Sequence, residues 1–555
     1  MGAGYPEFII TSRVHSDFLI VIECKADEIK HISKDGDRYA EYAVDGVLLY
    51  ASFLSKEFDV LAVAVSGQTQ STLLVSHYLH LQGTEQAVEF PTSSILSFDA
   101  YYDKMISSDI KFRQDYDTLI AFSRDLNEEL HAKKIKEAHR GLLICGILVA
   151  LENEAFRNSF RVHRTAKQLA GNLVESIINE FKTAKLPPDR IASLEAAFFF
   201  IKQNTTLTSD RDFFVRLIEN IESNVNTFIR THKYRDALGQ FYVQFLRYAN
   251  NDKGLGIVLT PPHIAELFAD IADVNKRSVV YDNCCGTAGL LIAAMKRILA
   301  DETLSKEDEI DVKNHRLIGV EFQDDIYALA VSNMVIHGDG KANIFSGDCF
   351  KLSEEIGNKY KPNVGLLNPP YKTKGSTIEE LTFVLDNLDT LEPGGTCVAI
   401  LPLGCAISSD STILGLKKKL LTNHTLEAVM SMPVDVFHDS EVGVVTCIMV
   451  ITAHHPHPPG KKTWFGYWRD DGFVTTKHRG RIDLNGTWEI IKERWLTAYR
   501  NREVIKGQSI AMEVGSDDEW CAEAYMETDY SELTTADFEQ EIKKYIAFRI
   551  LNERL

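Results

Sequence analysis

Short apolar runs rich in β-branched residues recur through the middle of the chain, and helical segments separate them. The runs begin at Ser278, Arg316, Val364, Cys397 and Val444. Strands that alternate with helices in this way pair in parallel, with helices on both faces of the sheet. We therefore predict a doubly wound α/β sheet over residues 251–455.

The first of these runs ends in a turn of small residues. Residues 279–282 form the strand, and a helix is predicted over residues 290–299. Glycines let the backbone approach a bound cofactor closely, and the start of a helix offers amide donors. The candidates for cofactor contact in this segment are Asp282, Gly286, Thr287, Ala288 and Gly289. Taken alone, the pattern is equally consistent with an ordinary strand-to-helix turn.

Two acidic residues follow the next two predicted strands. Glu321 ends one of them, where a carboxylate can accept both ribose hydroxyls of an adenosine group. Asp348 ends the other, where it can accept the amino group of the cofactor's adenine. For Glu321 in isolation, a solvated carboxylate at a strand end stays the simpler alternative.

The segment Asn368-Pro369-Pro370-Tyr371 follows the apolar run that begins at Val364. An amino group on a base ring is a poor nucleophile because its lone pair is delocalised. The Asn368 side-chain oxygen and the Pro369 carbonyl can accept its N–H groups, and the prolines fix the backbone. Tyr371 offers a face on which a flipped planar base can stack. The position of this segment after a cofactor-type sheet favours catalysis over a rigid turn.

These motifs resemble a known family. Residues 230–450 are similar to the modification subunit of type I restriction-modification systems, within the gamma class of amino methyltransferases. The similarity extends to residues 236–242, 256–261 and 327–338. The resemblance implies a Rossmann-like class I methyltransferase core that uses S-adenosylmethionine and methylates adenine N6 in double-stranded DNA.

The resemblance also implies roles for single residues. Asn368 is expected to contact the cofactor as well as the substrate, and Phe437 to pack against the flipped base. At Asn283, Cys284 and Ala288 the turn departs from the family's usual Asp-Pro-Ala-Cys-Gly-Thr-Gly, so details of cofactor affinity are expected to differ. The expected cofactor site is lined by Val258, Thr260, Pro261, Thr287, Ala288, Gly289, Glu321 and Asp348.

A second group of candidate residues lies near the first residue of the chain. Glu23 and Lys25 are two apart on a predicted strand, so their side chains share a face. Glu7 begins the preceding strand and can meet them across a hairpin. A metal-dependent phosphodiesterase needs acidic ligands for Mg²⁺, here Glu7 and Glu23, and a lysine that orients water. A surface ion pair on an edge strand is the alternative.

About residues 4–75 resemble the nuclease domain of type I restriction subunits, which belongs to the Pro-Asp…(Asp/Glu)-x-Lys superfamily. The resemblance rests on Pro6-Glu7, on Glu23-Cys24-Lys25 and on the segment at residues 38–43. Single-chain subunits of the type IIB kind, which fuse this nuclease to this methyltransferase, are more similar than either separate subunit. Glu7 replaces the usual aspartate and stands close to the first residue, so activity of the nuclease stays open.

The chain therefore divides into four expected regions. Residues 1–100 form a small α/β nuclease-like domain that could be truncated at its N-terminus, with one helix expected over residues 37–54. An all-α domain covers residues 101–250, and the methyltransferase core follows over 251–455. Residues 456–555 form a C-terminal region suited to docking a partner.

The net charge and the absence of known DNA-binding motifs indicate how the chain recognises its DNA target. The formal net charge of -19 argues against DNA binding over the whole surface. No helix-turn-helix, zinc module or long basic stripe occurs. We therefore expect a separate specificity subunit in a hetero-oligomer. Residues 461–469 and 477–481 mix basic and aromatic side chains, which suits phosphate contacts or a β-hairpin.

The cellular setting is predicted from three absences. No apolar run approaches the roughly 20 residues that span a bilayer, and no signal segment begins the chain. The nine cysteines lack the paired spacing of a zinc site. We expect a cytoplasmic protein with reduced, buried thiols and no membrane contact.

Three alternatives stay open. The same Asn-Pro-Pro-Tyr segment serves enzymes that methylate protein glutamine or RNA adenine. Cytosine N4 is also a substrate for such sites, although asparagine at position 368 favours adenine. Finally, the chain could serve modification or assembly with an inactive nuclease.

Overall fold

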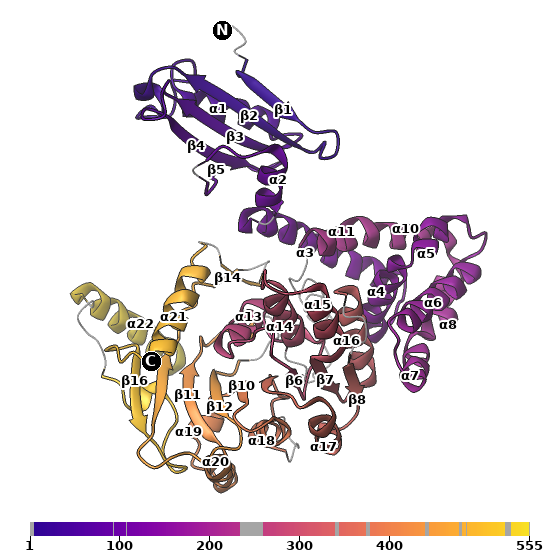
Figure 1. The fold of residues 1–555 in the computed structure, drawn as a ribbon, viewed down its shortest axis with the longest axis vertical. Helices are drawn as coiled ribbons and strands as arrows, with labels where there is room; N and C mark the ends of the chain where they lie inside the picture. Colours follow the sequence, from indigo (N-terminus) through magenta and orange to yellow (C-terminus); the bar gives the residue numbers. More distant parts are fainter. Residues whose placement is uncertain are drawn as a thin grey trace. The chain divides into compact units, whose positions relative to one another are not determined.

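The computed structural model describes residues 5–232, 259–338, 343–372, 378–438, 443–476, 480–483, 486–527 and 534–553, apart from residues 93 and 107. The chain divides into two compact units, Met1–Thr118 and Leu119–Leu555 (Figure 1). Each unit has its own sheet and its own buried core.

The first unit contains a five-stranded sheet with a helix on each face. Strands β2 and β3 pair in parallel, and the other neighbours are antiparallel. Alternate residues of β2 point to opposite faces: Leu19 packs with α1 (Ala43–Leu54), and Phe18 packs with α2 (Phe98–Ile106). In spatial order the strands are β1 (Phe8–Thr11), β2 (Phe18–Lys25), β3 (Asp59–Ser66), β4 (Leu74–His80) and β5 (Val88–Glu89).

The second unit is built on a nine-stranded mixed sheet. Strands β10, β9, β6, β7 and β8 are parallel to one another. Strand β12 lies antiparallel between β10 and β11. In spatial order the strands are β16 (Ser509–Glu513), β13 (Lys462–Tyr467), β11 (Thr425–Ser431), β12 (Thr446–Thr452), β10 (Thr396–Pro402), β9 (Val364–Leu367), β6 (Val280–Asp282), β7 (Leu317–Glu321) and β8 (Asn343–Ser346).

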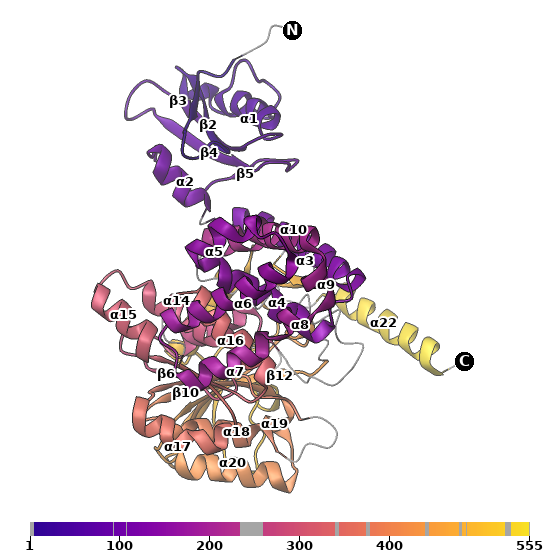
Figure 2. The ribbon, with the colours of Figure 1, turned by 90° about the vertical axis from the view of Figure 1, so that its right-hand side faces the viewer.

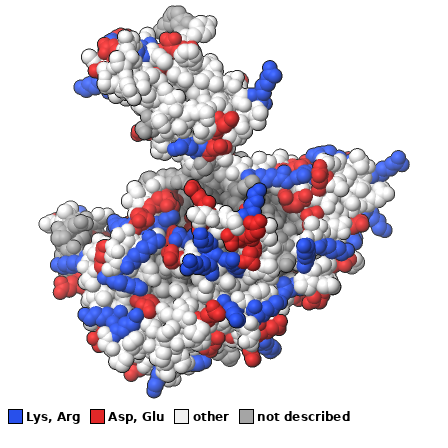
Figure 3. Space-filling model, in the orientation of Figure 1, with Lys and Arg blue, Asp and Glu red and all other residues white. Residues whose placement is uncertain are grey.

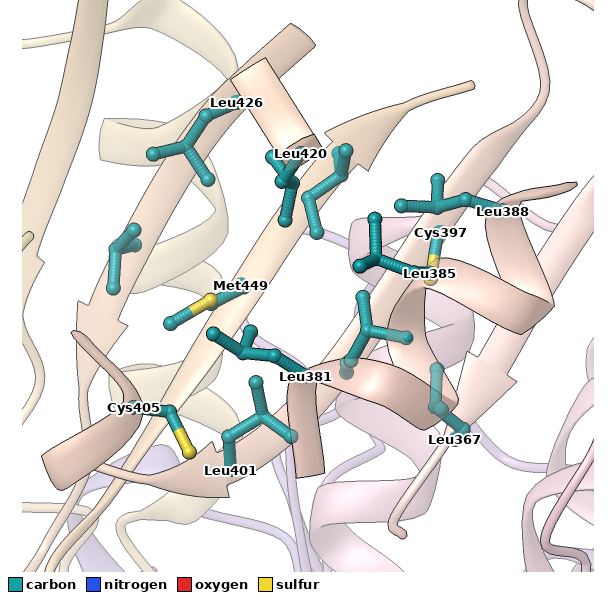
Figure 4. Packing of buried hydrophobic residues seen from close by; sticks show 14 of the residues in the cluster. Leu367, Leu381, Leu385, Leu388, Cys397, Leu401, Cys405, Leu420, Leu426 and Met449 are labelled. Carbon is teal, nitrogen blue, oxygen red and sulfur yellow. The ribbon is translucent and has the colours of Figure 1, made fainter. Parts of the chain in front are cut away.

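Helices cover both faces of this sheet, so the predicted doubly wound arrangement is confirmed. Figure 2 shows α17, α18 and α20 together on one side. Leucines of α18 and α20 meet strand residues such as Leu401 and Met449 in a continuous apolar core (Figure 4). The helices are α13 (Pro262–Ile271), α14 (Gly289–Leu299), α15 (Lys306–His315), α16 (Asp324–Ile336), α17 (Cys349–Tyr360), α18 (Glu380–Thr390), α19 (Gly404–Ile407), α20 (Ser411–Asn423), α21 (Trp488–Asn501) and α22 (Thr535–Glu553).

Residues 109–231 form successive helices. Helix α4 is buried on nearly every side because it packs against α6 and against α16 of the sheet layer. Pro187 and Pro188 separate α6 from α7, because proline supplies no amide donor inside a helix. The helices are α3 (Asp109–Ala132), α4 (Glu137–Glu152), α5 (Glu154–Ser159), α6 (Ala166–Thr183), α7 (Pro188–Phe198), α8 (Phe200–Gln203), α9 (Thr205–Ser209), α10 (Arg211–Ile221) and α11 (Thr227–Thr231).

Two local predictions are corrected. The helix expected over residues 37–54 begins only at Ala43, because the Asp45 carboxylate accepts the Ser33 and Arg38 amides and holds that segment in a turn. Residues 461–469 do not form a hairpin: Lys462–Tyr467 is strand β13, which joins the central sheet between β11 and β16.

The state of the cysteines and the character of the helices follow from the described residues. All nine cysteines are free thiols, and seven of them are buried. Within the described ranges, no helix combines the length and the apolar character that crossing a bilayer requires.

Candidate active site

The sequence-predicted residues of the methyltransferase core converge at one edge of the sheet. Strands β6, β7, β8 and β9 are parallel, so their carboxyl ends lie along the same edge. Asp282, Glu321 and Asn368 end or follow three of these strands, and Asp348 follows β8 by two residues. Val258 lies outside the described residues.

The turn after β6 is held by backbone and side-chain hydrogen bonds. Gly286 and Ala288 both have positive φ, 53° and 68°, and Ala288 directly precedes α14. The buried Asp282 carboxylate accepts the Cys284 amide at 3.0 Å. The Thr287 carbonyl accepts the Asn333 side-chain amide at 2.8 Å. The turn is therefore fixed in a conformation that leads directly into the start of α14.

Glu321 connects the turn to the neighbouring strand. Its two carboxylate oxygens accept the Gly286 amide at 3.1 Å and the Gln323 amide at 2.8 Å. Burial raises the pKa of Glu321, and these backbone donors oppose that shift. Each carboxylate oxygen has two lone pairs, so the same group can also accept hydroxyls.

Asp348 has a structural contact at this edge. Its carboxylate accepts the Phe350 amide at 3.1 Å and so caps the start of α17. Lys351 lies 3.4 Å from the other carboxylate oxygen. The cap fixes the carboxylate beside the cofactor edge, and its expected contact with adenine stays a prediction.

The segment after β9 is joined to the start of α13. The Asn368 side-chain nitrogen donates to the Thr260 hydroxyl at 3.1 Å, and Thr260-Pro261 directly precede α13. This bond directs the side-chain nitrogen of Asn368 toward Thr260, so the side-chain oxygen of Asn368 points away from Thr260. Pro369 is buried, whereas Pro370 is exposed.

Tyr371 and Phe437 meet, as their expected roles on one base require. Their ring centroids are 5.8 Å apart and the rings are perpendicular. Phe437 follows β11 and is almost completely buried. Burial raises the pKa of Tyr371, so its phenol is neutral. The pair can therefore provide an apolar edge-to-face contact but no charge.

Sequence reasoning assigned no role to two buried asparagines that hold the turn. Asn283 donates to the Phe383 carbonyl at 2.9 Å and to the Asp386 carboxylate at 3.1 Å, which anchors the turn to α18. Asn333 supports Thr287, as described above. Asn333 lies in the family-like segment at residues 327–338, and that resemblance could have indicated its supporting role. Asn283 stood out in the sequence only as a departure from the family's usual turn.

In the first unit, the structure brings Glu7, Glu23 and Lys25 together. The β1–β2 register pairs Phe8 with Ile22, which places Glu7 beside Glu23. The Lys25 ammonium lies 2.7 Å from one Glu23 oxygen, and the other Glu23 oxygen is buried with no hydrogen-bond partner in the described structure. Burial raises the pKa of the Cys24 thiol, and the charges of Glu7 and Glu23 raise it further.

Among the described residues, no three His, Cys, Asp or Glu side chains form a ready-made metal site. The two carboxylates nevertheless fit a Mg²⁺ ion, which commonly uses one or two carboxylates and fills its remaining positions with water and phosphate oxygens. The unpartnered, buried oxygen of Glu23 is the observation that supports this fit.

Comparison with known proteins agrees with this geometry. The chain is 28% identical over 581 residues to the type II restriction enzyme and methyltransferase RM.BcgI of Heyndrickxia coagulans, covering 99% of this chain and 90% of that protein. It is 26% identical over 276 residues to the EcoKI methylase subunit of Escherichia coli K12, covering 46% of this chain and 51% of that protein.

The fold also matches a solved structure, the methyltransferase subunit of a type I restriction-modification system from Streptococcus thermophilus. The TM-score is 0.51 at 15% identity, covering 75% of this chain and all of that one. The profile of the family described as N-6 DNA Methylase matches residues 233–553, more than half of the chain. This match spans the sheet edge that carries Glu321 and Asn368, and the chain therefore belongs to the N-6 DNA methylase family.

Proposed function

We propose that this chain is a restriction-modification subunit that transfers a methyl group from S-adenosylmethionine to adenine N6 in DNA. The observation that carries the proposal is the position of Asn368-Pro-Pro-Tyr371 after β9, at the same sheet edge as Glu321. The bond between Asn368 and Thr260 joins the substrate side of the site to the cofactor side.

The described residues at this edge fit an adenosyl cofactor. The turn at residues 283–288 presents backbone amides at the start of α14, Glu321 accepts the ribose hydroxyls, and Asp348 faces the adenine. Thr260 and Pro261 close the other side. S-adenosylmethionine supplies an electrophilic methyl group when bound.

The catalytic step depends on hydrogen-bond acceptors for the target amino group. The Asn368 side-chain oxygen and the Pro369 carbonyl accept its two N–H groups, which localises the nitrogen lone pair for attack on the methyl carbon. Tyr371 and Phe437 hold the flipped base from one side. After transfer, the surplus proton leaves the amino group for solvent.

The experiment measures labelled methyl transfer to unmodified DNA in the presence of the neighbouring-gene specificity subunit. We expect Asn368→Ala to lower the rate about 100-fold or more, the effect of losing one preorganised polar contact in other enzymes. Asn501→Ala, an exposed asparagine on α21, serves as the matched control. Unchanged activity of Asn368→Ala would exclude this site.

The modified nucleoside identifies the substrate. Label in N6-methyladenine supports the proposal. Label in N4-methylcytosine would change the target base to cytosine and leave the proposed active site unchanged. If the chain bound the cofactor but labelled only protein or RNA, the DNA assignment would be wrong.

We further propose that the first unit carries a Mg²⁺-dependent DNA endonuclease. Glu7 and Glu23 would hold the metal, whose charge would make a bound water more acidic, and Lys25 would orient that water. We expect Lys25→Ala to abolish cleavage by the assembled complex and to leave methylation unchanged. Lys34→Ala, an exposed lysine of the same unit, is the control. Absence of metal-dependent cleavage by the wild type would favour the alternative of an inactive nuclease.

A separate specificity subunit supplies target recognition in this proposal. On the face drawn in Figure 3, Lys and Arg side chains are interspersed with Asp and Glu, in keeping with the net charge of -19. The exposed face of α22 provides an apolar docking stripe of Phe538, Ile542, Tyr545 and Ile546. The functional complex is then a hetero-oligomer on double-stranded DNA.

A further inference from the structure

A buried ion pair lies next to the proposed site. Two nitrogens of the Arg481 guanidinium lie 2.6 Å and 2.5 Å from the two oxygens of Asp471. Asp471 is completely buried and the Arg481 side chain is 5% exposed. The Arg481 side chain is therefore engaged inside the protein. This disfavours the phosphate contact that the basic segment at residues 477–481 suggested for it. A planar guanidinium facing a carboxylate in this way has a defined orientation.

On one side, the pair is joined to the cofactor segment. The His263 imidazole lies 3.3 Å from Asp471, and His263 occupies the first turn of α13. Three residues earlier, Thr260 accepts the hydrogen bond of Asn368. The ring of Phe473 stacks on His263 with centroids 3.9 Å apart. The position of Asp471 is thus linked to the start of α13.

On the other side, the pair is joined to the segment that carries Phe437. The remaining guanidinium nitrogen of Arg481 lies 3.0 Å from the Asp435 carboxylate, two residues before Phe437. The Thr475 hydroxyl donates to the other Asp435 oxygen at 3.1 Å. One guanidinium therefore bridges the base-side segment and the cofactor-side segment.

The antiparallel strand pair that carries Arg481 is held by several contacts where it meets this network. It consists of β14 (Val474–Thr476) and β15 (Gly480–Ile482). Gly472 before it has a φ of 76°, and a side chain there would collide with the Thr487 hydroxyl. The Phe473 amide donates to Asp471 at 3.1 Å. These contacts fix Asp471 and Arg481 relative to each other.

We propose that Arg481 is a positioning residue for methyl transfer, which sets the placement of Phe437 and its base relative to Thr260 and Asn368. This inference rests on the proposed function of the site. Arginine is required because its planar fork meets Asp471 through two nitrogens and Asp435 through the third, whereas the ammonium of lysine is a single point of charge. Removal of the guanidinium leaves the buried carboxylate of Asp471 without its compensating charge.

The base side of the bridge can be released without the cofactor side. Asp435→Asn removes the charge on the base side only and keeps an acceptor for Thr475. We expect it to lower kcat about 10-fold, since small misplacement of a reacting group is costly, and to leave KM for S-adenosylmethionine within about 2-fold. Arg481→Lys releases both sides, so we expect a fall in kcat of about 10- to 100-fold together with a raised KM for S-adenosylmethionine.

The matched control is Arg140→Lys. Arg140 is also a buried arginine, which donates to the Ile135 carbonyl and the Asn127 side chain within the helical part of the chain. The assay is steady-state methylation of unmodified DNA by the complete complex, with melting temperature measured for each variant. We expect Arg140→Lys to lower the melting temperature without a change in kcat.

Combination of variants tests the bridge itself. If Asp435 acts through Arg481, the double variant loses no more kcat than Arg481→Lys alone. Unchanged kcat in both single variants, or equal kinetic effects of Arg481→Lys and Arg140→Lys, would overturn the inference. Should Arg481→Lys fail to fold, Asp435→Asn alone decides, because Asp435 is partly exposed. Activity retained by Asn368→Ala in the same assay would instead refute the proposed site.

Discussion

The carboxyl group of Asp282 is enclosed at the end of β6, and its burial has a consequence for stability. Burial raises its pKa to about 8, and the nearby charge of Glu321 adds to the shift. In an unfolded chain the same group titrates near pH 4. The protonated form therefore favours the folded state, and this contribution is complete below about pH 4 and is lost as the pH rises to about 8.

We expect Asp282→Asn to raise the melting temperature, by an amount that increases between pH 5 and pH 9. Asparagine keeps an oxygen that accepts the Cys284 amide and carries no charge to bury. Thermal melting of both proteins across this range measures the effect. A difference in melting temperature that did not depend on pH would contradict the assigned ionisation.

In the proposed site, Glu321 accepts the ribose hydroxyls of the cofactor. Both of its oxygens accept backbone amides, so Glu321→Gln places a side-chain donor against one of these donors. We expect the dissociation constant for S-adenosylmethionine to rise about 10-fold or more, as for loss of a charged hydrogen-bond partner. Calorimetric titration measures it, with the exposed Glu354→Gln as control. Equal affinities would place the ribose elsewhere.

At the scale of residues, motif spacing predicted which side chains share the sheet edge but not what holds them. Asn368, Tyr371 and Phe437 were expected to act on one base, and the structure brings Tyr371 and Phe437 into contact. The bond from Asn368 to Thr260 spans 108 residues of sequence. No local pattern predicts such a pair, because it depends on how α13 returns to the sheet.

At the scale of elements, the strands that carry the site were predictable because each is a buried apolar run between turn signals. Strand β13 was not. Its partner β11 lies more than thirty residues earlier, and the aromatic residues of its sequence Lys-Thr-Trp-Phe-Gly-Tyr also suit a hairpin strand. Pairing between distant strands depends on the whole sheet, so the local sequence did not indicate the neighbours of this strand.

Close packing between β9 and α18 gives a test at this scale. A side chain on Gly365 would collide with the buried Asn387 side chain, which also donates to the Asn283 side chain at 3.3 Å. We expect Gly365→Ala to destabilise the protein by about 1–3 kcal/mol, the usual effect of overpacking. It also displaces the strand that presents Asn368, so methylation falls as well.

The matched control for this variant is Gly415→Ala. Gly415 lies inside α20, and a side chain there meets open space. Alanine is preferred to glycine within helices, so we expect stabilisation of about 0.5–1 kcal/mol. Urea unfolding compares the two variants. Equal effects would show that the packing of Asn387 on Gly365 does not constrain β9.

At the scale of the whole molecule, the two proposed chemistries lie in separate units. Glu23 and Lys25 lie in Met1–Thr118, and Asn368 lies in Leu119–Leu555. Each group is held by its own sheet, so a substitution at one is expected to leave the other active. Both proposed activities act on DNA, and the described surface mixes both signs of charge on the face in Figure 3. Recognition of the target by the proposed specificity subunit would then serve both activities at once.

Docking of that partner is the last test. On α22, Phe538, Ile542, Tyr545 and Ile546 recur at spacings of four, three and one, which places them on one face, and each is 50–59% exposed. Such a stripe suits an apolar helix of a partner. We expect Ile542→Asp to weaken binding of the specificity subunit about 10- to 100-fold, because an apolar contact is lost and a charge must be buried.

Gln540→Asp introduces the same charge on the opposite, exposed face of α22 and should leave the affinity unchanged. Co-purification and light scattering with the neighbouring-gene specificity subunit measure the effect, and cofactor titration verifies that the methyltransferase core is intact. Partner-dependent methylation should fall with Ile542→Asp in proportion to the lost complex. If both variants bound the subunit equally well, the partner would have to dock on another surface, and the helices at residues 109–231 would be the next to examine.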